Sequence, residues 1–272
     1  MKIEFIASSL DPAGKNIALK VIEKFGLEKK DHVFNNPFYE KDDLRLLFID
    51  VESIMLDQID LPYESDLIIM LSKHKSAQSV NSLTTHPTGN LVNEAKLGGR
   101  PKHISYTNPW YMSEYYRTLT ELYQDAAKDK VTLSMEVTHH GPTEKRTPLF
   151  FVEIGSDERQ WQNPAHAERI ADALYKTIIN KPKKVDAFVG FGGGHYAPAF
   201  SHYITKEDVA IGHMVPKYAL IEGVDDEVLL SLFSKSLLDK PRALVDKKGI
   251  ASKECKELLS FFDRNSIEVI KI

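Results

Sequence analysis

Five histidines lie where α/β proteins concentrate their chemistry, in loops that follow stretches reading as β-strands. They are His74, His86, His139, His140 and His195, and each lies in a segment rich in Gly, Pro, Ser, Thr or Asn. Histidine ligates metal ions and moves protons near neutral pH. Several such loops with carboxylates nearby predict a hydrolytic site, open to assistance by a metal ion.

Two glutamates lie close to these histidines in the sequence or in the expected sheet. Glu136 falls near the end of the expected strand 131–137, and Glu153 falls at the end of the strand 149–154. If the two strands pair, the carboxylates lie close together. A carboxylate among apolar residues is costly unless it is paired or bound, so both are candidate metal ligands or general bases. The alternative is that each satisfies backbone amides or an arginine.

The residues around the histidines limit what each can do. On extended backbone the side chains of His139 and His140 point to opposite sides, so one of the two is expected to face a given site. Gly192, Gly193 and Gly194 can adopt positive φ, and their amides are candidates to bind the substrate as an oxyanion pocket. The spacing matches neither a P-loop nor a dinucleotide fingerprint. The alternative for His195 is a loop residue that bonds its own turn.

The sequence contains no compact metal or nucleophile motif. Cys-x-x-Cys, His-Glu-x-x-His and Gly-x-Ser-x-Gly are all missing, although such motifs identify many zinc and serine hydrolase sites. A zinc site must therefore be assembled from separated loops. We expect His139, His140 and His195 as metal ligands, and Glu136, Glu153, His74 and His86 as catalytic groups. His213, inside an apolar strand, is as readily a buried histidine with satisfied hydrogen bonds.

The composition is that of an ordinary globular chain. Of 272 residues 42% are hydrophobic and 27% charged, and no apolar run is long enough for a transmembrane helix. The single cysteine excludes an intramolecular disulfide and fits a reducing compartment, so a cytoplasmic location is expected. The net charge of −4 argues against non-specific binding of DNA over the whole surface, but it is compatible with a local basic patch that binds the end of an RNA.

Alternating strand and helix patterns predict the fold class. Short apolar runs predict strands at 3–7, 46–51, 67–71, 131–137, 149–154, 187–191, 210–214, 243–245 and 267–270. Amphipathic patterns predict helices at 13–25, 113–127, 164–179, 225–238 and 252–262. We expect one α/β domain over residues 1–272, with a largely parallel or mixed central sheet flanked by helices.

One long segment stands apart from this pattern. Residues 76–103 are poorly periodic and rich in Ser, Thr, Asn and Gly, so we interpret them as a long functional loop folded over one edge of the sheet. The segment ends with the cations Lys96, Arg100 and Lys102. Arg100 and Lys102 are candidate contacts to substrate phosphates; the alternative is a solvated loop.

Several blocks together resemble a known family. These blocks are Ser72-Lys-His74, Leu83-Thr-Thr-His-Pro-Thr-Gly-Asn90, Gly98-Gly99, Glu136-Val-Thr-His-His-Gly-Pro-Thr143, Val152-Glu-Ile-Gly-Ser156 with Trp161, Gly192-Gly-Gly-His-Tyr-Ala-Pro198 and Ile211-Gly-His-Met-Val-Pro-Lys-Tyr-Ala219. In this order they resemble the D-aminoacyl-tRNA deacylases of the archaeal and plant type.

The resemblance implies a substrate, a cofactor and a fold. It implies hydrolysis of the ester joining a D-amino acid to the 3′ end of an aminoacylated tRNA, zinc as cofactor, and a core related to phosphorylase and peptidyl-tRNA hydrolase folds. No membrane partner is expected. Two alternatives remain open: a zinc-dependent peptidase or amidase acting on a small substrate, which the negative charge favours, and a non-catalytic module that binds RNA ends.

Overall fold

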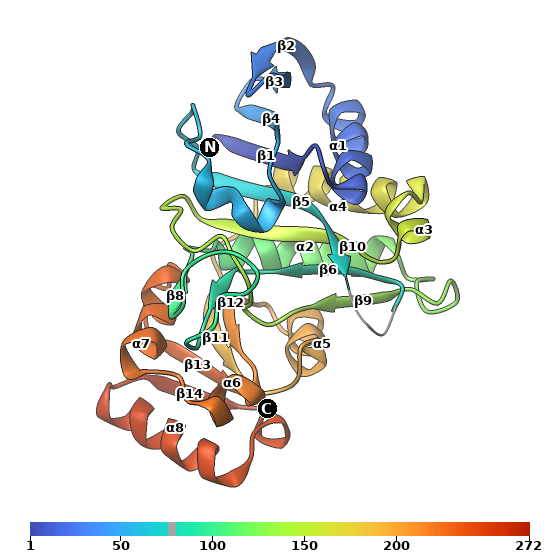
Figure 1. The fold of residues 1–272 in the computed structure, drawn as a ribbon. Helices are drawn as coiled ribbons and strands as arrows, with labels where there is room; N and C mark the ends of the chain where they lie inside the picture. The colour runs from blue at the N-terminus through green and yellow to red at the C-terminus, as the bar shows by residue number, and fades with distance from the viewer. Residues whose placement is uncertain (76–79) are drawn as a thin grey trace.

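The structure is a computed structural model that describes residues 1–75 and 80–272. Its largest element is an eight-stranded mixed sheet with the order β2-β3-β4-β1-β5-β10-β6-β9 (Figure 1). The strands are β1 (Ile3–Ser8), β2 (Glu28–Val33), β3 (Asn36–Lys41), β4 (Leu44–Ile49), β5 (Leu67–Lys75), β6 (Ser82–His86), β9 (Thr132–Met135) and β10 (Leu149–Ser156). β4, β1, β5 and β10 run parallel, and β6 runs antiparallel to β10 and parallel to β9.

A second, smaller sheet is wholly parallel. Its order is β12-β11-β13-β14, formed by β11 (Asp186–Phe191), β12 (Val209–Val215), β13 (Arg242–Val245) and β14 (Glu268–Lys271). A short ribbon pairs β7 (Gly89–Asn90) with β8 (His103–Ile104). The sequence predicts all four strands of this small sheet, but in the large sheet it misses β2, β3 and β6, and it does not predict the division into two sheets.

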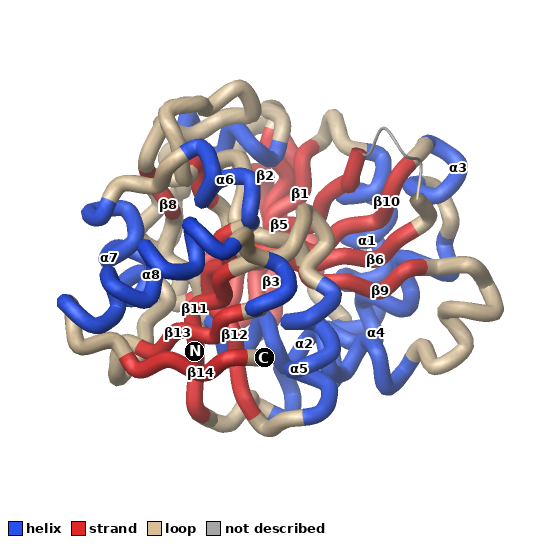
Figure 2. The backbone as a smooth tube through the Cα atoms, turned by 90° about the horizontal axis from the view of Figure 1, so that it is seen from below, coloured by secondary structure: helices blue, strands red, loops and turns tan. Residues whose placement is uncertain are grey.

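Helices cover the sheets and join them. They are α1 (Pro12–Phe25), α2 (Pro109–Leu122), α3 (Glu158–Trp161), α4 (Pro164–Asn180), α5 (Pro198–Lys206), α6 (Lys217–Glu222), α7 (Asp226–Lys235) and α8 (Ser252–Arg264), with 3₁₀ turns η1 (Ser53–Gln58) and η2 (Lys247–Gly249). α1 and α2 each pack against α4 on one face of the large sheet, and α2 also packs on β12 (Figure 1). α7 and α8 cover the small sheet (Figure 2).

Local sequence explains where the main helices begin and end. α1 begins after Asp11, whose carboxylate accepts a hydrogen bond from the Gly14 amide at 2.9 Å, and Gly26 closes the helix with φ +63°. α4 begins as the sequence predicts, with Asn163 as N-cap and Pro164 in the first turn. One continuous apolar core includes Phe5 of β1, Ile170 of α4 and Ile211 of β12, so the two sheets share it.

The predicted fold class is confirmed, as is the presence of all nine predicted strands and five predicted helices. The chief difference concerns residues 76–103. Positions 76–79 lie outside the described residues, but Ser82–His86 is β6, which lies between β10 and β9 in the large sheet. The sequence hides this strand because its polar residues Thr84, Thr85 and His86 are buried by tertiary packing.

Among the described residues, no helix combines the length and the apolar character needed to cross a membrane. The expected relation to phosphorylase and peptidyl-tRNA hydrolase folds stays a prediction.

Candidate functional site

Glu136 is the centre of a cluster of imidazoles. It follows β9 directly and is fully buried. Its Oε1 lies 3.2 Å from Nδ1 of His74, and its Oε2 lies 3.3 Å from Nε2 of His195 and 3.6 Å from Nε2 of His139. His74 lies in β5 near its end, while His139 and His195 lie in the loops that follow β9 and β11, so the structure brings together histidines from three separate segments.

Glu153 forms the second half of the cluster. Its Oε2 lies 3.4 Å from His74 Nδ1 and 3.5 Å from His86 Nε2. Burial acts to raise the pKa of Glu153, but the charges of the neighbouring His86 and His74 imidazoles outweigh it and hold that pKa below its ordinary range. Glu153 is therefore a carboxylate near neutral pH. β9 and β10 do not pair, since β6 lies between them, but the two carboxylates still lie close together because both contact Nδ1 of His74.

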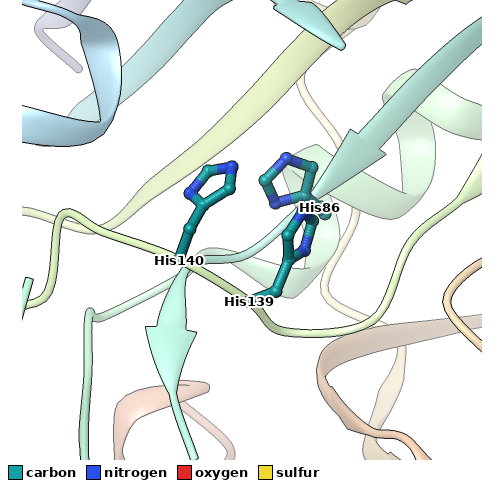
Figure 3. Close-up of side chains that lie close together, drawn as sticks. All are labelled: His86, His139 and His140. Atoms are coloured by element: carbon teal, nitrogen blue, oxygen red, sulfur yellow. The ribbon is translucent and has the colours of Figure 1, made fainter. Parts of the chain in front are cut away.

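Two of these imidazoles, His86 and His139, lie together with a third, His140, beside the glutamates. His86, His139 and His140 have ring centroids 4.2–4.9 Å apart (Figure 3). The Nδ1 atom of each lies within hydrogen-bonding distance of a backbone carbonyl, at 3.2 Å for His86, 2.8 Å for His139 and 2.7 Å for His140. A carbonyl accepts only from a protonated ring nitrogen, so these contacts place a proton on each Nδ1 and leave the Nε2 atoms of His139 and His140 for a ligand. Burial acts to lower the pKa of His86, but Glu153 outweighs it and raises that pKa, so His86 must lose a proton before its Nε2 can bind a metal ion.

The expectation that only one of His139 and His140 faces the site is wrong. His140 has φ +42°, so the backbone leaves the extended conformation and both rings turn to the same side. Burial and neighbouring imidazoles lower the pKa of His139 well below its ordinary value, and burial with the charge of His86 lowers that of His140 to about 4. Both are therefore neutral, which is the metal-binding form.

The residues present fit a zinc ion. The side chains form three overlapping groups, and within each group the possible ligand atoms lie within 4.8 Å of one another. The groups are His86 with His139 and His140, His74 with Glu136 and His195, and His86 with Glu136 and Glu153. Both oxygens of Glu136 and Nε2 of His86 are buried without a hydrogen bond of acceptable geometry among the described residues. Such atoms are costly unless something binds them, and imidazole nitrogen with carboxylate oxygen is a donor set that zinc prefers.

His74 is held on its other side by two aromatic residues. Its Nε2 lies 3.0 Å from the Tyr196 hydroxyl, and its backbone carbonyl accepts a hydrogen bond from the Trp161 indole at 3.1 Å. Sequence reasoning assigned no role to Tyr196, although it directly follows His195. Burial acts to lower the pKa of His74, but Glu153 and Glu136 outweigh it and raise that pKa to about 9.

The triple glycine differs from expectation. The Gly192 amide donates to the Val215 carbonyl at 2.8 Å, and the Gly193 amide donates to the Gly249 carbonyl at 3.0 Å. Both amides are thus engaged in holding the loop and do not form the predicted oxyanion pocket. In the described part of the chain the Gly194 amide has no acceptor, and nothing lies within 4 Å of a Cβ built there.

A cavity of about 270 Å³ opens onto the cluster, and His74, His139, His140, His195 and Glu153 line it. Arg100 and Lys102 do not line this cavity. Arg100 pairs with Glu144 at 2.9 Å and Lys102 with Asp225 at 2.8 Å, both on the outer surface. Leu97, earlier in the same segment, does reach the cavity.

His213 is a buried histidine with satisfied hydrogen bonds. It is fully buried, with Nδ1 3.0 Å from the Thr138 hydroxyl and Nε2 2.9 Å from the Ser105 carbonyl. Burial lowers its pKa to about 3, so it stays neutral. It supports the loop that carries His139 and His140.

Comparisons with known proteins identify the family of the chain. The model of a family described as D-aminoacyl-tRNA deacylase matches residues 61–270. The D-aminoacyl-tRNA deacylase of Methanocaldococcus jannaschii is 37% identical, with 98% of each chain covered, and that of Pyrococcus abyssi is 34% identical, with all of each chain covered. A crystal structure titled as a conserved protein of unknown function superposes with a TM-score of 0.90 at 28% identity, covering 99% of this chain and 95% of the other.

Proposed function

The chain belongs to the D-aminoacyl-tRNA deacylase family of hydrolases, and we propose that zinc bound at the histidine cluster assists its hydrolysis of the ester between a D-amino acid and the 3′ end of tRNA. The observation that carries the zinc proposal is the set of buried Glu136 oxygens and imidazole nitrogens that converge without hydrogen bonds between them. We further propose a cytoplasmic protein, in keeping with its single cysteine.

His86, His139 and His140 would hold zinc through their Nε2 atoms, since a backbone carbonyl occupies each Nδ1. When bound, zinc lowers the pKa of water and polarises a carbonyl. Glu136 shares its oxygens with His74 and His195, so it can serve as a further ligand or accept the proton of the attacking water.

His195 is suited to carry that proton onward. Its side chain is 38% exposed, whereas that of Glu136 is fully buried, so His195 connects the carboxylate to the cavity. It would deliver the proton to the departing ribose oxygen as general acid. The Gly194 amide, which has no acceptor among the described residues, can donate to the developing oxyanion.

Selection between D- and L-amino acids requires a wall close to Cα. A site that accepts many side chains has to fix the α-amino group and the ester carbonyl, so that only one enantiomer of the amino acid directs its side chain into open space. Gly194 and His195 border the cluster and can provide this wall, because glycine lets the backbone approach closely. A mismatch of about 3–4 kcal/mol gives about 10²–10³-fold discrimination.

Single-turnover deacylation of D- and L-tyrosyl-tRNA, with and without a chelator, tests the proposal. We expect the D-ester to react about 10²–10³ times faster than the L-ester, and the chelator to abolish that reaction. Glycyl-tRNA, which has no side chain to reject, should react to some degree. Equal rates on the two esters would refute the stereochemical assignment, and full activity of metal-free protein would refute the zinc assignment.

A further inference from the structure

A second cavity lies on the outer surface beyond the loop of His139 and His140. We call it the basic pocket; its volume is about 500 Å³, and its walls include Arg100, Tyr106, Thr143, Lys145, Arg146 and Lys235. One carboxylate, that of Glu144, also lines it and pairs with Arg100 at 2.9 Å. Three cationic side chains therefore remain without an acidic partner in the described part of the chain.

Two of these cations are held in place by backbone. The Lys145 ammonium donates to the Ile59 carbonyl at 2.6 Å, and the Lys235 ammonium donates to the Ile104 carbonyl at 2.7 Å. An ammonium has three donors, so each keeps two protons for another acceptor. Both side chains are partly buried, and a partly buried cation with no carboxylate is costly unless an anion joins it.

The third cation is unrestrained. Among the described residues the Arg146 guanidinium has neither a hydrogen bond nor an ion pair, and its side chain is exposed at the rim of the basic pocket. A guanidinium offers a planar fork of donors that matches a phosphate. Tyr106 adds a partly exposed aromatic ring, with Lys235 5.5 Å from the ring centroid.

The wall between the cations is built from specific contacts. The Thr143 hydroxyl accepts a hydrogen bond from the Arg100 amide at 2.8 Å, while the amides of Thr143 and Glu144 donate to the Asp57 carboxylate at 2.7 and 3.1 Å. Gly99, with φ +74°, lets the two segments meet, since a Cβ there would lie 2.5 Å from Thr143. The basic pocket is thus ordered without a ligand.

Two chain segments connect the basic pocket to the cavity of the histidine cluster. Leu97 and His140 line the cluster cavity, while Arg100 and Thr143, each three residues further along, line the basic pocket. Three residues span at most about 11 Å. A nucleic-acid strand with stacked bases advances about 3.4 Å for each nucleotide, so the distance between the two cavities corresponds to about three nucleotides.

We propose that the basic pocket binds the phosphates and a base of the unpaired nucleotides that precede the esterified 3′ end of the RNA. Lys145, Lys235 and Arg146 contact phosphate oxygens, and Tyr106 stacks on a base, as aromatic residues do in proteins that bind single strands. This inference rests on the proposed function for the identity of the ligand. It assigns the main phosphate contacts to these residues and not to Lys102, whose ammonium is paired with Asp225.

The test measures equilibrium binding of an uncharged RNA hairpin with an unpaired 3′ end, with a blunt hairpin as second probe. Arg146→Glu breaks no hydrogen bond or ion pair among the described residues. The matched control is Lys176→Glu on α4, which is also exposed and has no such contact there. We expect Arg146→Glu to weaken binding of the overhanging hairpin about tenfold, about 1.4 kcal/mol. The slope of log affinity against log salt should fall by about 0.7–1. Lys176→Glu should change neither.

A second pair of variants tests the stacking role. Tyr106→Leu should weaken binding of the overhanging hairpin about five- to tenfold, whereas Tyr106→Phe, which keeps the ring, should bind as the unchanged protein does. Equal effects of Arg146→Glu and Lys176→Glu, or equal binding of overhanging and blunt hairpins, would overturn the inference. Normal hairpin binding without hydrolysis of D-tyrosyl-tRNA would instead overturn the proposed function and leave the basic pocket as an RNA site.

Discussion

Nδ1 of His74 lies 3.2 Å from Oε1 of Glu136, although β10 and β6 separate their strands β5 and β9 in the sheet. β5 extends to Lys75, and Glu136, directly after β9, forms an antiparallel bridge with Tyr196. The same Nδ1 lies 3.4 Å from Glu153. One imidazole therefore couples the two glutamates, so their substitutions should not have additive effects.

Glu136→Gln should lower turnover of D-tyrosyl-tRNA by about 10² or more, since it removes a ligand or proton acceptor while keeping the shape. It should also lower the melting temperature of metal-free protein, because His74, whose raised pKa Glu136 helps to maintain, loses a neighbouring carboxylate in the protein interior. Steady-state kinetics and thermal melts would measure both, with the exposed Glu64→Gln as control. Unchanged turnover would remove Glu136 from the mechanism.

Zinc should be retained by the purified, dialysed protein, and its content should fall when His139 or His140 is replaced by alanine. Both residues are neutral and present Nε2 beside His86, so loss of either breaks the donor set. Elemental analysis would measure the content, with His202→Ala, outside the cluster, as control. Wild-type protein that contains no metal after dialysis and keeps full activity would contradict this prediction.

His195→Ala should reduce deacylation by about 10² or more, with the fold retained, because His195 connects Glu136 to the cavity. Its side chain is partly exposed, so truncation should leave the melting temperature nearly unchanged. Single-turnover rates combined with circular dichroism would separate the two effects. A loss of activity matched by a loss of folded protein would argue for a structural role.

Glu4 makes stability depend on pH far from the site. Burial raises the pKa of Glu4 from 4.5 to about 7, against the hydrogen bond of Ser65 and the charge of Arg45. As the pH rises, the unfolded chain therefore loses this proton before the folded chain does, and the free energy of unfolding should fall between pH 4.5 and about 7. The expected decrease is about 3 kcal/mol, because each pKa unit corresponds to 1.36 kcal/mol. Denaturant unfolding of metal-free protein, measured across this pH range, should show the decrease in the wild type and not in Glu4→Gln. The same pH dependence of stability in both proteins would contradict this prediction.

Much of the fold could be predicted from local sequence. Apolar runs such as that of β5 and capped helices such as α1 are fixed by period and end signals that need no distant partner. β6 could not be found this way. Its buried Thr84, Thr85 and His86 read as polar loop, and only its place between β10 and β9 makes it a strand.

The candidate site divides in the same way. Residue types and places near strand ends were enough to select His74, His139, His195, Glu136 and Glu153. The parallel-strand argument does not explain why they meet, because β9 runs antiparallel to β5 and β10, and β11 belongs to the other sheet. Their pairing, the inward turn of His140 at φ +42° and the engagement of the Gly192 and Gly193 amides were decided by tertiary structure. These features depend on contacts between segments that are distant in the sequence, and local patterns in a single sequence do not specify such contacts.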